Sequence, residues 1–211
     1  MERRMKVLIA CEFSGTVREA FAANGHNAWS CDLMPSEIAG QHIQGDVLSI
    51  LGDGWDLMVG HPPCTYLTVS GNKWLKDQSP RKSGALVGHA RREARKAAVD
   101  FFLQLMTCDI PKIAIENPIG VLSTLYRKPC QVVQPWQFGC GETKATCLWL
   151  KNLPLLRPTN IVPERVQRLH LLPKTADRWK IRSRTYQGIA NAMAEQWSPL
   201  ERHTKWPNYF L

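Results

Sequence analysis

Two residues in this sequence have the chemical types needed for covalent catalysis. Cys64 ends the stretch His61-Pro62-Pro63-Cys64, and Glu116 opens the stretch Glu116-Asn117-Pro118. Proline fixes φ and lacks an N–H group, so a strand must end there, and we expect Cys64 in a stiff turn. A thiolate can attack an electrophile while an acid protonates or hydrogen-bonds it. The alternative is that Cys64 is a small buried residue without chemistry, as most free cysteines are.

Three further residues follow apolar runs in the same way. Phe13 begins a Phe-Ser-Gly turn after residues 6–10, Asp32 ends residues 27–32, and Asp46 precedes another loop. In an open α/β sheet, ligands bind beyond the carboxyl ends of the strands. We therefore expect these three residues to converge with Cys64 and Glu116 at one edge of a sheet.

The elements that position these residues alternate between strand and helix. The apolar runs predict strands at residues 6–10 and 27–32, before His61, and at residues 112–115 and 146–150. Helices are predicted between Gly15 and Gly25, over residues 84–108 and over residues 188–197. Strand, glycine turn, helix, strand and acid form a nucleotide-type βαβ unit, although the full GxGxxG pattern of a dinucleotide site is absent.

Composition points to a polyanionic partner. The 211 residues carry a net charge of +9, concentrated in residues 72–96 and 168–185, and clustered Lys and Arg favour nucleic acid. No apolar run approaches the roughly 18 residues that span a bilayer, so we expect a soluble, cytoplasmic protein without a membrane partner. Seven cysteines without a CxxC pair indicate reduced thiols and no metal site.

The order of these motifs resembles the cytosine-5 DNA methyltransferases, and most closely their short, phage-borne members. The family has an F-S/A-G turn, two acids, P-C, E-N and a late G-N; here the last reads Gly-Ile-Ala-Asn and ends at Asn191. The resemblance implies a Rossmann-like, S-adenosylmethionine-dependent methyltransferase fold, with a mostly parallel twisted sheet and helices on both faces. It also implies one catalytic domain over residues 1–211, in the bacterial host cytoplasm if the protein is phage-encoded.

The resemblance also implies a role for each site residue. Cys64 would add to C6 of cytosine in DNA, and Glu116 would engage the ring N3 and the exocyclic amine. C5 would then accept the methyl group of S-adenosyl-L-methionine. The residues expected to bind this cofactor are Phe13, Ser14, Gly15, Asp32, Asp46, Pro62 and Asn191.

The sequence departs from the family where target recognition occurs. Residues 151–187 form a reduced segment in place of a recognition domain, so DNA contacts must come from the two basic segments, with Trp74 and Trp179 as candidates for base stacking. The family's Q-x-R-x-R motif is replaced by residues 142–150. The residues expected to bind the substrate are therefore Asn117, Lys144 and Thr146.

Two other functions remain open. Because a recognition domain is missing, the same chemistry could act on a free cytosine nucleotide. The chain could also be a catalytically idle DNA-binding module. Methyl transfer that is lost in Cys64→Ala separates the enzymes from the module, and a reactive Cys64 should be alkylated faster than the other six cysteines.

Overall fold

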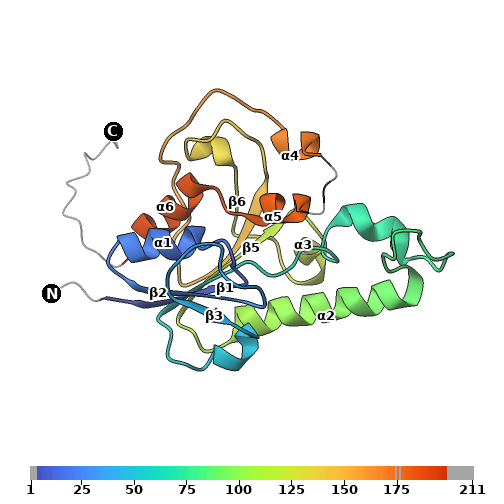
Figure 1. Cartoon of the computed structure of the whole chain (residues 1–211), viewed down its shortest axis with the longest axis horizontal. Helices are drawn as coiled ribbons and strands as arrows, with labels where there is room; N and C mark the ends of the chain where they lie inside the picture. Colours follow the sequence, from blue (N-terminus) through green and yellow to red (C-terminus); the bar gives the residue numbers. More distant parts are fainter. Residues whose placement is uncertain (1–3, 174, 176, 199–211) are drawn as a thin grey trace.

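The computed structural model describes residues 4–173, 175 and 177–198. These residues form a seven-stranded sheet in the order β3-β2-β1-β4-β5-β7-β6 (Figure 1). The strands are β1 (Lys6–Ala10), β2 (Asn27–Asp32), β3 (His42–Gln44), β4 (Leu57–Gly60), β5 (Lys112–Pro118), β6 (Gln131–Val133) and β7 (Thr146–Lys151). Strands β1 to β5 pair in parallel, whereas β7 runs antiparallel to β5 and β6. The predicted mostly parallel α/β sheet is confirmed.

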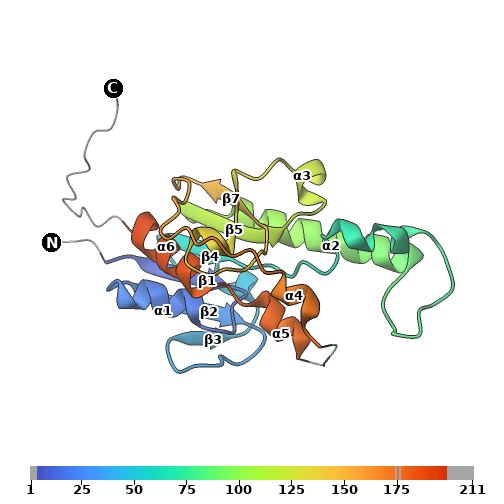
Figure 2. The same cartoon turned by 90° about the horizontal axis from the view of Figure 1, so that it is seen from above.

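Helices cover both faces of the sheet. Helices α1 (Thr16–Ala23) and α6 (Gln187–Trp197) pack together on one face, and α2 (Gly88–Thr107) lies on the other (Figures 1 and 2). Val7 and Ile9 of β1 pack in the core under α1 and α6, whereas Leu8 and Ala10 pack in the core under α2. Burial on both faces explains why these strands are continuous apolar runs. The shorter helices are α3 (Leu122–Leu125), α4 (Arg168–Leu171), α5 (Arg178–Ser183), η1 (Val47–Ile50), η2 (Val69–Leu75) and η3 (Pro135–Gln137).

The strand order reverses between β1 and β4. From β1 the chain builds outward through β2 and β3, and then returns to place β4 and β5 on the other side of β1. Such a reversal opens a crevice at the carboxyl ends of the two central strands, where open α/β sheets bind ligands. The turn after β1 and the Cys64 turn after β4 lie on either side of this point.

The structure differs from the predicted elements in three places. The short strand β6 lies between prolines and was not predicted. Helix α2 begins at Gly88, not at Gly84. Strand β5 continues beyond Ile115 to Pro118, because the antiparallel β7 pairs with it as far as Pro118. Glu116 therefore lies within a strand, where it pairs with Leu148 of β7.

The connection from β7 to α6 is mostly irregular. Residues 152–186 contain the short helices α4 and α5 and two isolated bridges, Phe138 to Asn160 and Glu142 to Val166. Lys174, part of the second basic segment, lies outside the described residues. In the part of the chain that is described, no helix has both the length and the apolar character required to cross a membrane.

Candidate active site

The Cys64 turn is fixed from two sides. Pro62 is buried, and the backbone N–H of Leu67 donates to the Cys64 carbonyl oxygen at 3.0 Å. From the neighbouring strand β5, Asn117 donates through Nδ2 to the carbonyl oxygen of Pro62, also at 3.0 Å. Cys64 itself is exposed. The turn thus presents the thiol to solvent, and the alternative of a small buried cysteine is wrong.

Several charges act on the Cys64 thiol. Desolvation by the surrounding protein raises its pKa, while Lys144 and Arg182 lower it; the net result is a raised pKa. The exposed Cys130 behaves in the opposite way. Desolvation raises its pKa, but Arg127, whose Nη1 lies 3.1 Å from the Cys130 sulfur, opposes this rise. The net result is a lowered pKa. In the free protein Cys130 is therefore the more acidic thiol, which the sequence did not indicate.

Glu116 is a nearly buried carboxylate with three partners. Its side chain is 11% exposed. Oε2 lies 3.1 Å from Nδ1 of His61 and accepts a hydrogen bond from the Thr185 hydroxyl at 3.4 Å, while Oε1 lies 3.9 Å from Nζ of Lys144. Burial raises the Glu116 pKa, but Lys144 and His61 together outweigh burial and hold this pKa at about 2. The group is a carboxylate at neutral pH.

Of the predicted substrate-binding residues, Lys144 is the one that reaches Glu116. Its ammonium group also donates to the backbone carbonyl of Arg184 at 3.2 Å. Thr146 is buried and donates its hydroxyl to the Lys144 carbonyl at 3.2 Å, so its side chain serves the local backbone. Asn117 is buried and stabilises the Cys64 turn.

The turn after β1 holds three predicted cofactor-binding residues, Phe13, Ser14 and Gly15. Gly15 has φ 74°, a left-handed conformation suited to glycine, and a Cβ at this position would lie 2.6 Å from the Ile38 side chain. The Ser14 hydroxyl donates to Oε1 of Glu12 at 3.2 Å, and Glu12 also accepts from two backbone N–H groups of the first turn of α1. Sequence reasoning missed this buried Glu12, which fixes the turn.

The two predicted aspartates lie near one another beyond β1 and β2. Oδ1 of Asp32 accepts from the Met34 N–H at 2.9 Å, and Oδ1 of Asp46 accepts from the Leu48 N–H at 3.0 Å. Both act on the partly buried Cys11, whose pKa is raised to about 12 first by desolvation and then by nearby charges that include the two carboxylates. The structure therefore brings Asp32 and Asp46 together around the end of β1.

Residues 177–186, termed the cover segment, join the two halves of this region. They include α5, which lies on the same side of the sheet as α1 and α6 (Figure 1). Three of its side chains contact the site or its neighbours: Trp179 contacts Phe13 with ring centroids 5.7 Å apart, Arg184 pairs with Glu37 at 2.7 Å, and Thr185 bonds Glu116 at 3.4 Å. The sequence marked this segment as basic and named Trp179 as a candidate for base stacking, but it did not indicate these contacts, because they are long-range.

The arginines at the start of α2, for which the sequence allowed either a solvated face or a phosphate contact, bond to the loop that follows Cys64. Arg91 is buried. Arg95 donates to the Tyr66 carbonyl and to Oδ1 of Asn72, both at 2.8 Å, and Arg92 bonds Asp77. These arginines stabilise the loop that follows Cys64.

The exposed cations lie further along that loop. Residues 73–87, termed the basic arm, project with the first half of α2 beyond the sheet (Figures 1 and 2). The arm carries Lys73, Lys76, Arg81 and Lys82. Trp74, predicted to stack on bases, already has the Arg81 guanidinium 4.0 Å from its ring centroid. The arm therefore offers mainly positive charge, because the Trp74 ring is already in contact with Arg81.

Asn191 is separate from the other predicted residues. It is exposed on α6, and its Oδ1 accepts a hydrogen bond from the Gln187 side chain, one helical turn earlier, at 2.8 Å. Its predicted cofactor contact remains a prediction.

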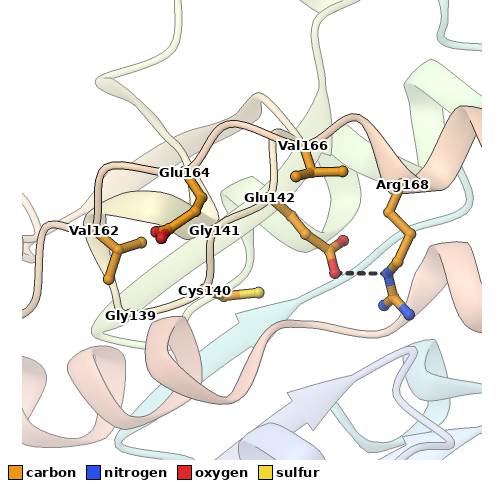
Figure 3. Close-up of a pocket in the computed structure, with 8 residues that line it drawn as sticks. All are labelled: Gly139, Cys140, Gly141, Glu142, Val162, Glu164, Val166 and Arg168. Carbon is orange, nitrogen blue, oxygen red and sulfur yellow. Dashed lines mark ion pairs between the residues drawn. The ribbon is translucent and has the colours of Figure 1, made fainter.

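A shallow hollow of about 370 Å³ lies beside the site. Figure 3 shows its lining: Gly139, Cys140, Gly141, Glu142, Val162, Glu164, Val166 and Arg168. Its main acid, Glu142, pairs with Arg168 at 2.6 Å and accepts a hydrogen bond from the Tyr186 hydroxyl at 2.6 Å. The hollow contains none of the predicted site residues, and its acid is already occupied by protein partners.

Within the described ranges, no group of three or more His, Cys, Asp or Glu side chains is arranged to hold a metal ion. No family model matches the sequence, and a search of curated proteins finds no match. The functional argument therefore depends on the geometry of the residues above.

Proposed function

We propose that the protein is an S-adenosylmethionine-dependent methyltransferase that transfers a methyl group to C5 of cytosine in DNA through a covalent adduct with Cys64. One observation carries this proposal: an exposed thiol and a nearly buried carboxylate follow the same position on two adjacent parallel strands. Gly60 of β4 pairs with Ile115 of β5, so the turn that leads to Cys64 begins beside Glu116, and the Glu116 charge acts on the Cys64 thiol.

This pairing suits a reaction at an unreactive ring carbon. C5 of cytosine becomes nucleophilic when a thiolate adds to C6 and an acid engages N3 on the other side of the ring. Lys144 and Arg182 oppose the rise in the Cys64 pKa that burial causes, although this pKa remains raised in the free protein. Lys144 also lies 3.9 Å from Glu116, so one cation supports both reacting groups.

The residues beyond β1 and β2 fit the cofactor that the proposal requires. Phe13 is buried beside Trp179 and is 7% exposed. The two aspartates carry the fit: in the described part of the chain only Oδ1 of Asp32 and of Asp46 accepts a hydrogen bond, which leaves Oδ2 of each for ribose or adenine donors. The nearby Trp179 ring borders Phe13 and would help to exclude water. When bound, S-adenosylmethionine supplies an electrophilic methyl group.

The charge distribution favours DNA as the substrate. The net charge is +9, and the basic arm projects where it could follow a phosphate backbone. A base in a duplex must be flipped out to reach Cys64. Residues 152–186 include only two short helices, so specificity must be limited. The same feature keeps a free cytosine nucleotide as the second candidate substrate.

Methyl transfer from tritiated S-adenosylmethionine tests the proposal. Wild type, Cys64→Ala and the matched control Cys130→Ala are each given duplex DNA, single-stranded DNA or free cytosine nucleotides. We expect 5-methylcytosine in DNA from wild type and Cys130→Ala and none from Cys64→Ala. Full activity in Cys64→Ala would refute the mechanism. Transfer to nucleotides alone would assign the second substrate, and salt-dependent DNA binding without any transfer would identify a binding module.

A further inference from the structure

His61 is the closest ionisable partner of Glu116. It follows β4 directly, and its Nδ1 lies 3.1 Å from Oε2 of Glu116, with each side chain 11% exposed. The register of β4 on β5 pairs Gly60 with Ile115, so the backbone itself places residues 61 and 116 side by side. The sheet therefore brings the two residues together, and their side chains complete the contact.

The groups that face this pair favour its charged form. Burial lowers the pKa of His61, but the hydrogen bond and charge of Glu116, with a smaller effect of Glu12, raise it above its ordinary value. Lys144 opposes this rise for His61 and lowers the pKa of Glu116, and Thr185 donates to Glu116. The raised pKa of His61 and the lowered pKa of Glu116 both favour an imidazolium next to a carboxylate.

The second nitrogen of His61, Nε2, has no hydrogen-bond partner among the described residues. Nε2 is buried and makes no hydrogen bond to any residue that the structure describes. An imidazolium carries an N–H on both nitrogens, so one buried donor is left unsatisfied. This makes the protonated ring a better acid than one with both nitrogens bonded, and its proton has a ready path along Nδ1 to Glu116.

The proposed reaction needs a proton at this place. Addition of Cys64 to C6 is assisted when the ring N3 is protonated, but a Glu116 carboxylate has no proton of its own to donate at neutral pH. We propose that His61 is a positioning residue that holds Glu116 and stores the proton that Glu116 delivers to N3 of the target cytosine. This inference rests on the proposed function.

The proton is returned at the end of each turnover. The N–H bond at Nδ1 of His61 breaks as an O–H bond forms on Glu116, and that O–H bond breaks as N3–H forms and the Cys64 sulfur bonds C6. After methyl transfer a water molecule acting as base takes the C5 proton, the C5=C6 double bond forms as the C6–S bond to Cys64 breaks, and the N3 proton returns by the same path. His61 and Glu116 are unchanged over the cycle.

Two measurements test the role of His61. The first is the pH profile of kcat between about pH 6 and pH 9 for wild type, His61→Asn and the control His89→Asn, an exposed histidine of α2. Asparagine can still donate to Glu116 but cannot ionise. We expect kcat of His61→Asn to fall about 10- to 100-fold at neutral pH, with the KM values little changed. The ratio of wild-type to His61→Asn rates should shrink as pH rises through the His61 pKa.

The second measurement does not need activity. NMR titration of the six histidines should show one ring with a raised pKa that is absent in His61→Asn and shifted down in Glu116→Gln, while Cys64→Ala leaves it unchanged. A neutral His61, or a wild-type profile in His61→Asn, overturns the inference and leaves the proposed function standing. If wild type transfers no methyl group to any substrate, the proposed function fails and proton delivery fails with it, whatever the titration shows.

Discussion

The Nδ2 of Asn117 donates a hydrogen bond of 3.0 Å to the carbonyl oxygen of Pro62 and so joins β5 to the turn that presents Cys64. Asn117 is buried, and it follows Glu116 directly in the sequence. The Glu-Asn pair therefore has two separate tasks: Asn117 fixes the Cys64 turn, and in the proposed reaction Glu116 faces the target ring.

Replacing Asn117 should cost both stability and activity. Asn117→Ala leaves the buried Pro62 carbonyl without its donor, which should lower the free energy of unfolding by about 1–3 kcal/mol. The turn should also loosen, so kcat should fall. Chemical denaturation and methyl-transfer assays check this against Gln104→Ala, an exposed site on α2 that should change neither. Unchanged stability in Asn117→Ala would mean that the bond contributes little.

Ionisation of Glu116 should make the stability of the fold depend on pH. Its pKa is about 2 in the folded chain against an ordinary 4.5, so the ionised carboxylate stabilises the fold above pH 4.5 and this contribution is lost as pH falls toward 2. The free energy of unfolding of wild type should therefore exceed that of Glu116→Gln by roughly 3 kcal/mol at neutral pH, and the two values should converge in acid. Urea unfolding at several pH values measures the difference. A difference that is constant with pH would contradict the assigned charge state.

Cysteine alkylation should single out two thiols. The Cys130 pKa is lowered by Arg127, whereas the Cys64 pKa is raised, so iodoacetamide at neutral pH should label Cys130 first and Cys64 next. Cys31 and Cys147 are buried and should react slowly. This order replaces the expectation from sequence that Cys64 reacts fastest. Peptide mass spectrometry over time checks it, and equal rates at all sites would contradict it.

The basic arm should contribute to DNA affinity through charge. Reversal of an exposed cation in Lys82→Glu should weaken DNA binding and reduce the slope of log affinity against log salt by about 1. Lys128→Glu makes the same change at an exposed residue outside the arm and should have a smaller effect. Fluorescence anisotropy at several salt concentrations measures both. Equal slopes in the two variants would exclude the arm from the interface.

Local patterns predicted the elements that carry the site. The apolar runs of β1, β2, β4, β5 and β7 are buried on both faces, and each strand was identified within a few residues. The prolines of the Cys64 turn predicted its position, because their effect on the backbone is local. The predicted end of β5 at Ile115 was wrong, because pairing with β7 extends the strand to Pro118 despite the local effect of that proline.

Contacts between distant segments could not be predicted. The bond between His61 and Glu116 joins residues 55 apart, and the contact of Trp179 with Phe13 depends on the path of an irregular segment. Arg91 and Arg95 share the basic composition of the arm, yet they are used to hold the loop after Cys64. Composition gives the charge of such residues but not their partners.

The most direct test of the central claim is covalent capture by DNA whose cytosines are replaced with 5-fluorocytosine. Fluorine cannot leave C5 as a proton can, so the thiolate cannot be expelled after methyl transfer. With S-adenosylmethionine, wild type and Cys130→Ala should form a DNA adduct that survives denaturation, with its mass on the Cys64 peptide, and Cys64→Ala should form none. Absence of an adduct at Cys64 in wild type, or an adduct that persists in Cys64→Ala, would contradict the account.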